Sequence, residues 1–257
     1  MGDRLRSVIF WLAAVAAVVT GHETAPGSTA AVWPNEPPGL DAITDDPFDA
    51  LTGNGWDIVD NGRGLVRIVA DSGAPQTPPS VIEYLYPVGF EGGDGPGAEY
   101  YRLPGLHVAY VGLWWKPSSP WQGHISSSNK IQYLRTDHQG NIVMVMYGPP
   151  GGPFELRVFP EFSTSSDQWL VPNAGDGHVT LGRWHRLEWL VSYNSGSTPG
   201  SVHWWLDGRL VGSYDHLRFP AEPLMEYKLS GLWGGAEPIR KRETDSYRYD
   251  HVHISGK

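Results

Sequence analysis

The sequence predicts an all-β protein with antiparallel sheets, and three observations support this fold class. Glycine and proline are abundant, with 32 and 22 copies among 257 residues, which divides the chain into short segments. No window keeps the apolar spacing of a helix for three turns. From Phe48 onward, short runs rich in β-branched and aromatic residues alternate with Gly, Pro, Asn or Asp. A dozen such runs at this spacing are typical of an antiparallel β-sandwich or barrel.

The predicted strands share this composition and these boundaries. In chain order they are 65–69, 81–86, 107–115, 130–135, 142–147, 156–159, 178–181, 184–193, 202–206, 210–214, 227–232 and 249–254. Asp207-Gly208 lies between two of them and is the strongest hairpin signal in the chain. The residues of 184–193 alternate in polarity, which indicates a strand with one face on the core and the other in solvent or in a groove.

The composition excludes several classes of protein. A net charge of −9 argues against a nucleic-acid binder, because few cations are present to neutralise phosphates. Hydrophobic residues make up 40% of the chain, which is enough for a core and argues against overall disorder. Cysteine is absent, so no disulfide can stabilise the fold. The twelve tryptophans are an unusual supply.

The N-terminal segment has the pattern of a secretory signal. Arginines at positions 4 and 6 precede an apolar run at 8–19, which is too short to cross a bilayer, and small residues follow it. We therefore predict a signal peptide at 1–21, a Pro/Gly-rich linker at 22–47 and one domain at 48–257. An uncleaved anchor is the alternative. The predicted location is extracellular or periplasmic, with no membrane span after cleavage of the signal.

An ordered set of features in the C-terminal half indicates a family. Gly182-Arg183-Trp184-His185-Arg186 opens a long strand, 202–211 contains Trp204-Trp205-Leu206-Asp207-Gly208, Gly234-Gly235 follows, and Asp250 lies in the closing strand. This set resembles the concanavalin A-like lectin/glucanase superfamily, especially its jelly-roll polysaccharide lyases that act on alginate and glucuronan. Similar hairpins and closing strands occur in laminin-G-like domains. The resemblance implies a jelly roll of two antiparallel sheets with a groove on its concave sheet.

The lyases of this branch have a catalytic pattern of three strands. They carry a lysine on a central strand, a Ser/Arg strand and a Tyr-x-Tyr strand just before a proline. Lys130 matches the lysine, whereas 143–147 contains no Ser-x-Arg, and Leu156 and Val158 stand where the tyrosines fall. Whether the chain is an enzyme is therefore left open.

Four residues are the candidate catalytic groups. β-Elimination on a uronic acid needs a group that neutralises the carboxylate, a base and an acid. Lys130 and Gln132 are predicted to share a strand face and to bind the carboxylate, and His124 or Tyr147 would transfer protons. The alternative is that the Lys130 face is an ordinary solvated strand face.

The tryptophans favour carbohydrate as the ligand, because sugar rings stack on indoles. Trp114-Trp115 and Trp204-Trp205 are adjacent pairs on strands, so one member of each pair points away from the core. Gly112 leaves a gap beside Trp114 in which a ligand could lie. The predicted substrate-binding residues are Tyr110, Trp114, Lys116, Arg186, His203 and Trp205. Burial of both strand faces by loops is the alternative.

Metal and glycosidase chemistry have weaker support. The resemblance implies a structural Ca²⁺ at Asp250, with Asp57 or Asp60 as a second carboxylate; a surface aspartate is the alternative. His251 and His253 are a possible zinc pair. Glu188 would have to provide one of the two carboxylates of a glycosidase.

Two functions of different classes follow. The first is a secreted protein that binds a polysaccharide or oligosaccharide in an aromatic-lined groove. The second is a polysaccharide lyase that cleaves a uronate-containing polymer by β-elimination. A structural or adhesive surface protein is a third possibility.

Overall fold

The computed structural model describes residues 32–138, 140–162, 169–194, 198–219, 221–235 and 237–257. The compact unit is Trp33–Lys257. Its described residues form antiparallel strands in two sheets and contain no helix, so the predicted fold class is confirmed. In this part of the chain there is accordingly no helix that could cross a membrane. The predicted signal segment lies outside the described residues.

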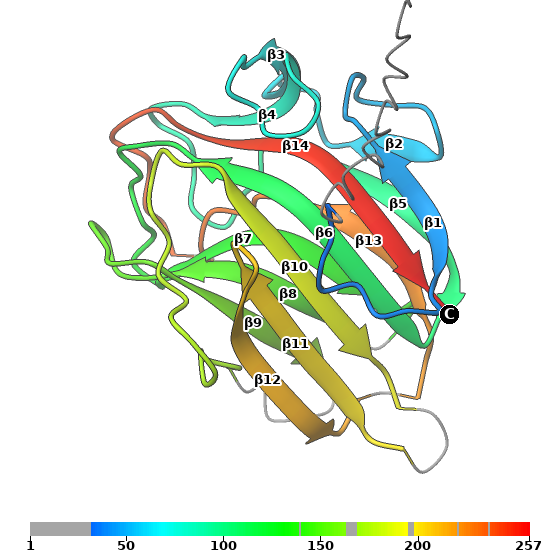
Figure 1. The fold of residues 1–257 in the computed structure, drawn as a ribbon. Coiled ribbons are helices and arrows are strands. Elements are labelled where there is room, and N and C mark those ends of the chain that lie inside the picture. Colours follow the sequence, from blue (N-terminus) through cyan, green and yellow to red (C-terminus); the bar gives the residue numbers. More distant parts are fainter. Residues whose placement is uncertain (1–31, 139, 163–168, 195–197, 220, 236) are drawn as a thin grey trace, which may run out of the picture. The chain divides into compact units, whose positions relative to one another are not determined.

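The larger sheet has eight strands. Seven follow the order β12-β11-β10-β6-β14-β4-β3, and β1 also pairs with β14. Figure 1 shows the closing strand β14 beside β6. The bounds are β1 Asp41–Asp46, β3 Val66–Ala70, β4 Ser80–Tyr86, β6 Val108–Pro117, β10 His185–Ser192, β11 Gly200–Leu206, β12 Arg209–Leu217 and β14 Asp245–Gly256.

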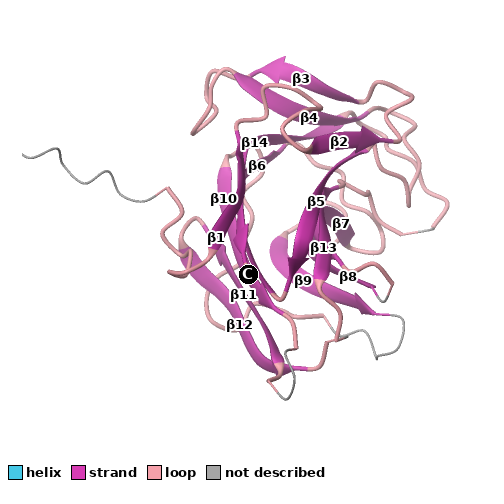
Figure 2. Cartoon of the chain, turned by 90° about the vertical axis from the view of Figure 1, so that its right-hand side faces the viewer, coloured by secondary structure: helices cyan, strands magenta, loops and turns pink. Residues whose placement is uncertain are grey.

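The smaller sheet has six strands in the order β2-β5-β13-β7-β8-β9. Their bounds are β2 Trp56–Val59, β5 Ala98–Leu106, β7 Ser128–Arg135, β8 Gly140–Tyr147, β9 Glu155–Phe162 and β13 Leu224–Leu229. Figure 2 shows the two sheets packed face to face as a sandwich. Each sheet therefore has an inner face on the common core and an outer face directed away from it.

The core between the sheets is rich in aromatic side chains. Trp115 and Trp204 are fully buried in it, whereas their neighbours Trp114 and Trp205 are half-buried on the other face of the same sheet. The prediction from the adjacent tryptophan pairs is confirmed. Gly212 leaves the space for one of these rings, because a Cβ there would lie 2.0 Å from Trp204. Burial of such large apolar surfaces is the main source of stability in a sandwich.

The predicted hairpin at Asp207-Gly208 connects β11 to β12. Both residues have positive φ, 52° and 79°, as the tight turns between twisted strands require. The Asp207 carboxylate accepts hydrogen bonds from the Arg186 backbone (2.9 Å) and lies 2.9 Å from His185 Nδ1. These contacts hold the turn against the start of β10.

Some strand predictions were wrong. The predicted linker includes β1, which pairs with β14, and 178–181 contributes only a single bridge, between His178 and Glu155. The strand expected at 227–232 begins and ends three residues earlier. β2 and β5 were not predicted. β1 is acidic and β5 contains Pro104-Gly105, so their partners, rather than local propensity, determine that they are strands.

Candidate functional site

Lys130 lies on the outer face of the six-stranded sheet. Its ammonium donates a hydrogen bond to Glu161 Oε1 at 2.6 Å and lies 5.7 Å from the centre of the Tyr133 ring. Tyr133 packs with the buried side chains of Val143 and Val145, which form a small apolar cluster separate from the main core. β8 thus places alternate residues on the two faces of the sheet.

Three aromatic rings extend this cluster along the outer face. Trp169 stacks on Phe159, with ring centres 4.3 Å apart and an angle of 23° between the planes. The same indole meets Tyr147 edge-on at 5.0 Å. We call Tyr147, Phe159 and Trp169 the aromatic patch; all three are half-buried. The patch offers flat apolar surface beside polar groups, as sugar-binding surfaces do.

A pocket of about 320 Å³ lies at the end of this patch. The Arg157 guanidinium stacks on the Tyr147 ring at 3.8 Å and pairs with Glu155. His178 comes from a separate segment and lines the same pocket. The full lining is Tyr147, Gly148, Pro149, Pro153, Phe154, Glu155, Arg157, Asp176 and His178. One cation and two groups that can exchange protons, Tyr147 and His178, are thus brought together.

Gln132 is not on the face that carries Lys130. A β-bulge between these residues shifts the register of β7 against β8, so the two side chains no longer alternate as in a regular strand. Gln132 is fully buried between the sheets, where its Oε1 accepts a hydrogen bond from the Tyr227 hydroxyl at 2.7 Å. The predicted pairing of Gln132 with Lys130 at a carboxylate was wrong.

His124 is also removed from the outer face. Its fully buried ring packs edge-on against Trp233 at 5.0 Å in the loops at one end of the sandwich. The Ser126 backbone donates to its Nδ1 at 3.1 Å, and burial lowers the pKa of the imidazole. His124 orders this loop and does not reach the pocket beside Tyr147, whose lining does not include it.

The predicted substrate-binding residues all lie on the eight-stranded sheet. Tyr110, Trp114, Lys116, Arg186, His203 and Trp205 come from β6, β10 and β11 and share its outer face. The Lys130 face belongs to the other sheet and points in the opposite direction. The expectation of one groove that contains both Lys130 and Trp114 was therefore wrong.

The gap expected at Gly112 is filled by the chain itself. A Cβ on Gly112 would lie 2.3 Å from the Trp33 ring, which also stacks on His253 at 6.0 Å. Beside it, the Glu188 carboxylate is fully buried and accepts hydrogen bonds from Tyr110 (2.6 Å) and Asn35 (3.0 Å). The segment around Trp33 thus covers the middle of this face.

Three further polar side chains of that face are also paired. Arg186 donates to Glu188 at 2.9 Å, and the indole of Trp114 donates to Gln76 at 3.2 Å. Lys116 forms an ion pair with Asp71, a carboxylate with only 11% of its side chain exposed. Glu188, fully buried and fully paired, is not placed as a glycosidase carboxylate.

The residues expected to bind calcium do not form a site together. Asp57 is exposed on β2 of the six-stranded sheet, whereas Asp250 is buried on β14 of the other sheet. The Asp250 oxygens accept hydrogen bonds from the backbone of Gln76 (2.8 Å) and from the backbone and hydroxyl of Thr77. Donor hydrogens around the carboxylate do not fit a cation. Nowhere in the described ranges do three or more His, Asp or Glu side chains form a group that could hold a metal.

Sequence reasoning missed Arg157, Phe159, Trp169 and His178. The alternation along 155–159 could have revealed Arg157 and Phe159. Leu156 and Val158 enter the core, so Arg157 and Phe159 face outward. Trp169 and His178 lie in connecting segments, and no local pattern connects them to this sheet.

The comparisons with solved structures show the fold. The alginate lyase vAL-1 from Chlorella virus matches with a TM-score of 0.59 and 11% identity, over 84% of this chain and 100% of the lyase. An endo-β-1,4-glucuronan lyase from the fungus Trichoderma reesei matches with a TM-score of 0.55 and 15% identity, over 79% and 92%. An alginate lyase in complex with an alginate trisaccharide matches with a TM-score of 0.58 and 11% identity, over 79% and 98%.

These similarities confirm the predicted jelly-roll fold. No protein-family model and no curated protein matches the sequence.

Proposed function

We propose that this chain binds a polysaccharide on the outer face of its six-stranded sheet. The observation that carries the proposal is the half-buried indole of Trp169, stacked on Phe159 next to a pocket that contains Arg157. A sugar ring would lie on the aromatic patch, and Arg157 would interact with a carboxylate or hydroxyl in the pocket. A solved alginate lyase of the same fold holds an alginate trisaccharide, which supports a saccharide as the ligand.

Calorimetric titration with alginate, glucuronan and a neutral glucan tests this proposal. Trp169→Ala should weaken binding of acidic and neutral chains alike by about tenfold, the effect of losing one aromatic contact. Trp205→Ala is the matched control, because Trp205 is also half-buried but lies on the outer face of the other sheet. Equal effects of the two changes, or none from either, would reject the six-stranded sheet as the binding face.

Arg157 separates charge recognition from stacking. Arg157→Gln should weaken alginate binding and leave the neutral glucan unaffected, and the difference should decrease as salt is added. Lys130→Ala should have a smaller effect, because Lys130 does not line the pocket that contains Arg157. If Arg157→Gln lowers the affinity for the neutral glucan as much as the affinity for alginate, Arg157 acts through packing and not through its charge.

A lyase activity at the same place is the second candidate. The pocket brings Tyr147 and His178, which can accept or donate a proton, next to Arg157. To neutralise a uronate carboxylate, Arg157 would exchange its ion pair with Glu155 for one with the substrate. In β-elimination the base removes the C5 proton, the C4–O bond breaks, and the acid protonates the leaving oxygen. Ultraviolet absorbance of the unsaturated product tests this, with Tyr147→Phe and His178→Asn as inactive variants. If the protein binds the glycan but the absorbance does not rise, it is a binding protein and not a lyase.

Export is part of the proposal, since such polysaccharides lie outside the cell. N-terminal sequencing of the protein recovered from outside the cytoplasm should begin after residue 21 or near residue 30. Recovery only from the cytoplasm with Met1 intact would argue against it.

A further inference from the structure

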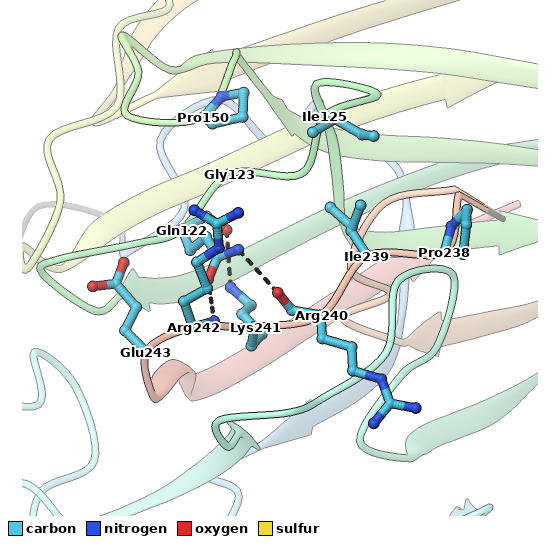
Figure 3. Close-up of a pocket in the computed structure, with 10 residues that line it drawn as sticks. All are labelled: Gln122, Gly123, Ile125, Pro150, Pro238, Ile239, Arg240, Lys241, Arg242 and Glu243. Atoms are coloured by element: carbon cyan, nitrogen blue, oxygen red, sulfur yellow. Dashed lines mark hydrogen bonds between the residues drawn. The ribbon is translucent and has the colours of Figure 1, made fainter.

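A second and larger pocket, of about 660 Å³, lies at the end of the sandwich where three loops meet. The loops connect β6 to β7, β8 to β9 and β13 to β14. Its lining residues are Gln122, Gly123, Ile125, Pro150, Pro238, Ile239, Arg240, Lys241, Arg242 and Glu243, all drawn in Figure 3. None of them lines the pocket beside Tyr147.

The walls of this pocket are held in place by Gln122. Its side-chain oxygen accepts a hydrogen bond from the Arg242 backbone at 2.5 Å, and its backbone oxygen accepts one from Lys241 Nζ at 2.9 Å. The Lys241 ammonium is buried, pairs with Asp245 and lies 4.0 Å from the centre of the Trp121 ring. These contacts fix the Arg242 backbone and the Lys241 ammonium at the wall of the pocket, whereas the Arg242 side chain itself is exposed.

The lining is cationic in a chain whose net charge is −9. It contains Arg240, Lys241 and Arg242 against one carboxylate, that of Glu243. Two of these cations already have a carboxylate partner: Lys241 pairs with Asp245, and Arg240 pairs with Glu91 at 2.5 Å. The Arg242 guanidinium has no hydrogen bond, ion pair or ring contact with any residue in the described part of the chain.

Figure 3 shows where this free cation points. The Arg242 side chain extends from the β13–β14 loop toward Gln122 and Gly123, whereas the Arg240 guanidinium points away from them. Ile125 and Pro150 form the opposite side of the pocket, and Ile239 and Pro238 lie at its end. Ile125 is a large apolar side chain in this lining, and it is 55% exposed.

We propose that this pocket binds a small organic carboxylate, with its acid group on Arg242 and its apolar body against Ile125. A guanidinium without a partner can form two parallel hydrogen bonds with a carboxylate, which explains the choice of anion. The exposed isoleucine and the prolines would exclude water from the rest of the ligand. The site is independent of glycan binding on the aromatic patch.

Titration of the full chain with four probes, followed by NMR, tests this assignment. Benzoate and D-glucuronate present a carboxylate on a ring, acetate lacks the ring, and D-glucose lacks the carboxylate. We expect at least one ring carboxylate to bind about tenfold more tightly than acetate and glucose. If benzoate binds more tightly than glucuronate, the ligand is an apolar or aromatic acid. If glucuronate binds more tightly, the ligand is a sugar acid.

Two variants of neighbouring arginines provide the matched comparison. Arg242→Gln should lower the affinity for the ring carboxylate by about tenfold or more. Arg240→Gln should change that affinity by less than about twofold, because Arg240 already pairs with Glu91. Ile125→Asp should also lower the affinity for the ring carboxylate, and it should leave the fold intact because this position is exposed. The proposal is overturned if neither ring carboxylate binds better than glucose, or if the two arginine variants behave alike. Trp169→Ala should leave this binding unchanged, so failure of the glycan site is distinguishable.

Discussion

Replacing Glu99 with glutamine should raise the free energy of unfolding near neutral pH. Glu99 is 1% exposed in the interior, and burial raises its pKa from 4.5 to about 8. Tyr84 is its partner: the hydroxyl lies against Glu99 Oε2, accepts from the Glu99 backbone at 3.1 Å and donates to Leu229 O at 3.0 Å. A protonated Glu99 can donate to that hydroxyl and complete the network, which an ionised one cannot.

The sign of the effect follows from the two protonation equilibria. Below pH 4.5 Glu99 carries its proton in the folded and unfolded chain alike, and its ionisation has no influence on stability. Between pH 4.5 and about 8 the folded chain keeps a proton that the unfolded chain has lost, so stability falls as pH rises. A pKa difference of one corresponds to about 1.4 kcal/mol, so this loss reaches about 3 kcal/mol near pH 7.

Glutamine cannot ionise, and its amide can still donate to Tyr84. Glu99→Gln should therefore match the wild type near pH 4 and exceed its free energy of unfolding by up to about 3 kcal/mol near pH 7. Urea denaturation at a series of pH values measures the difference. Glu237→Gln is the control, because 45% of that side chain is exposed. A difference that stays constant with pH, or a less stable Glu99→Gln protein at pH 7, would refute the reasoning.

Three further changes test other parts of the structure. Lys241→Met should lower the free energy of unfolding by about 3–5 kcal/mol, because the buried Asp245 carboxylate loses its cation and keeps only the hydrogen bond from the Gln122 backbone. Burial lowers the pKa of Lys241 to about 8, so the folded chain gives up this proton before the unfolded chain does, and wild-type stability should rise between about pH 8 and 10. Gly112→Ala should displace Trp33, seen as faster hydrogen exchange of residues 33–36 while the core exchanges as before. Asp250→Ala should lower the free energy of unfolding by about 1–3 kcal/mol, and a chelator should leave the melting temperature of the wild type unchanged; a large fall with the chelator would contradict the assignment of Asp250 to loop hydrogen bonds.

The sequence predicted the fold well because its signals are local. Alternation predicted that one tryptophan of each adjacent pair leaves the core, and the structure buries Trp115 and Trp204. The Asp207-Gly208 dipeptide predicted the turn, where both residues have positive φ. Strands whose only support is a neighbouring strand escaped prediction. β1 is an acidic segment that becomes a strand through its pairing with β14.

The candidate site was harder to predict because it depends on long-range placement. Nothing in the sequence around Lys130 and Trp114 tells which sheet each strand joins, and the two residues are on opposite outer faces. The bulge in β7 reverses the direction expected for Gln132, and a period of two cannot reveal a bulge. Trp169 and His178 reach the site from connecting segments.

The two outer faces differ in how fully their own chain satisfies them. On the eight-stranded sheet Trp33 fills the space above Gly112, and the carboxylate of Glu188 accepts hydrogen bonds from Tyr110, Asn35 and Arg186. A ligand there would have to displace a buried indole and break a closed hydrogen-bond network, which costs free energy before any contact is gained. On the six-stranded sheet the aromatic patch is half-buried and borders a pocket. A polysaccharide would reach the aromatic patch without displacing a buried indole, which is why we propose the binding site on that face.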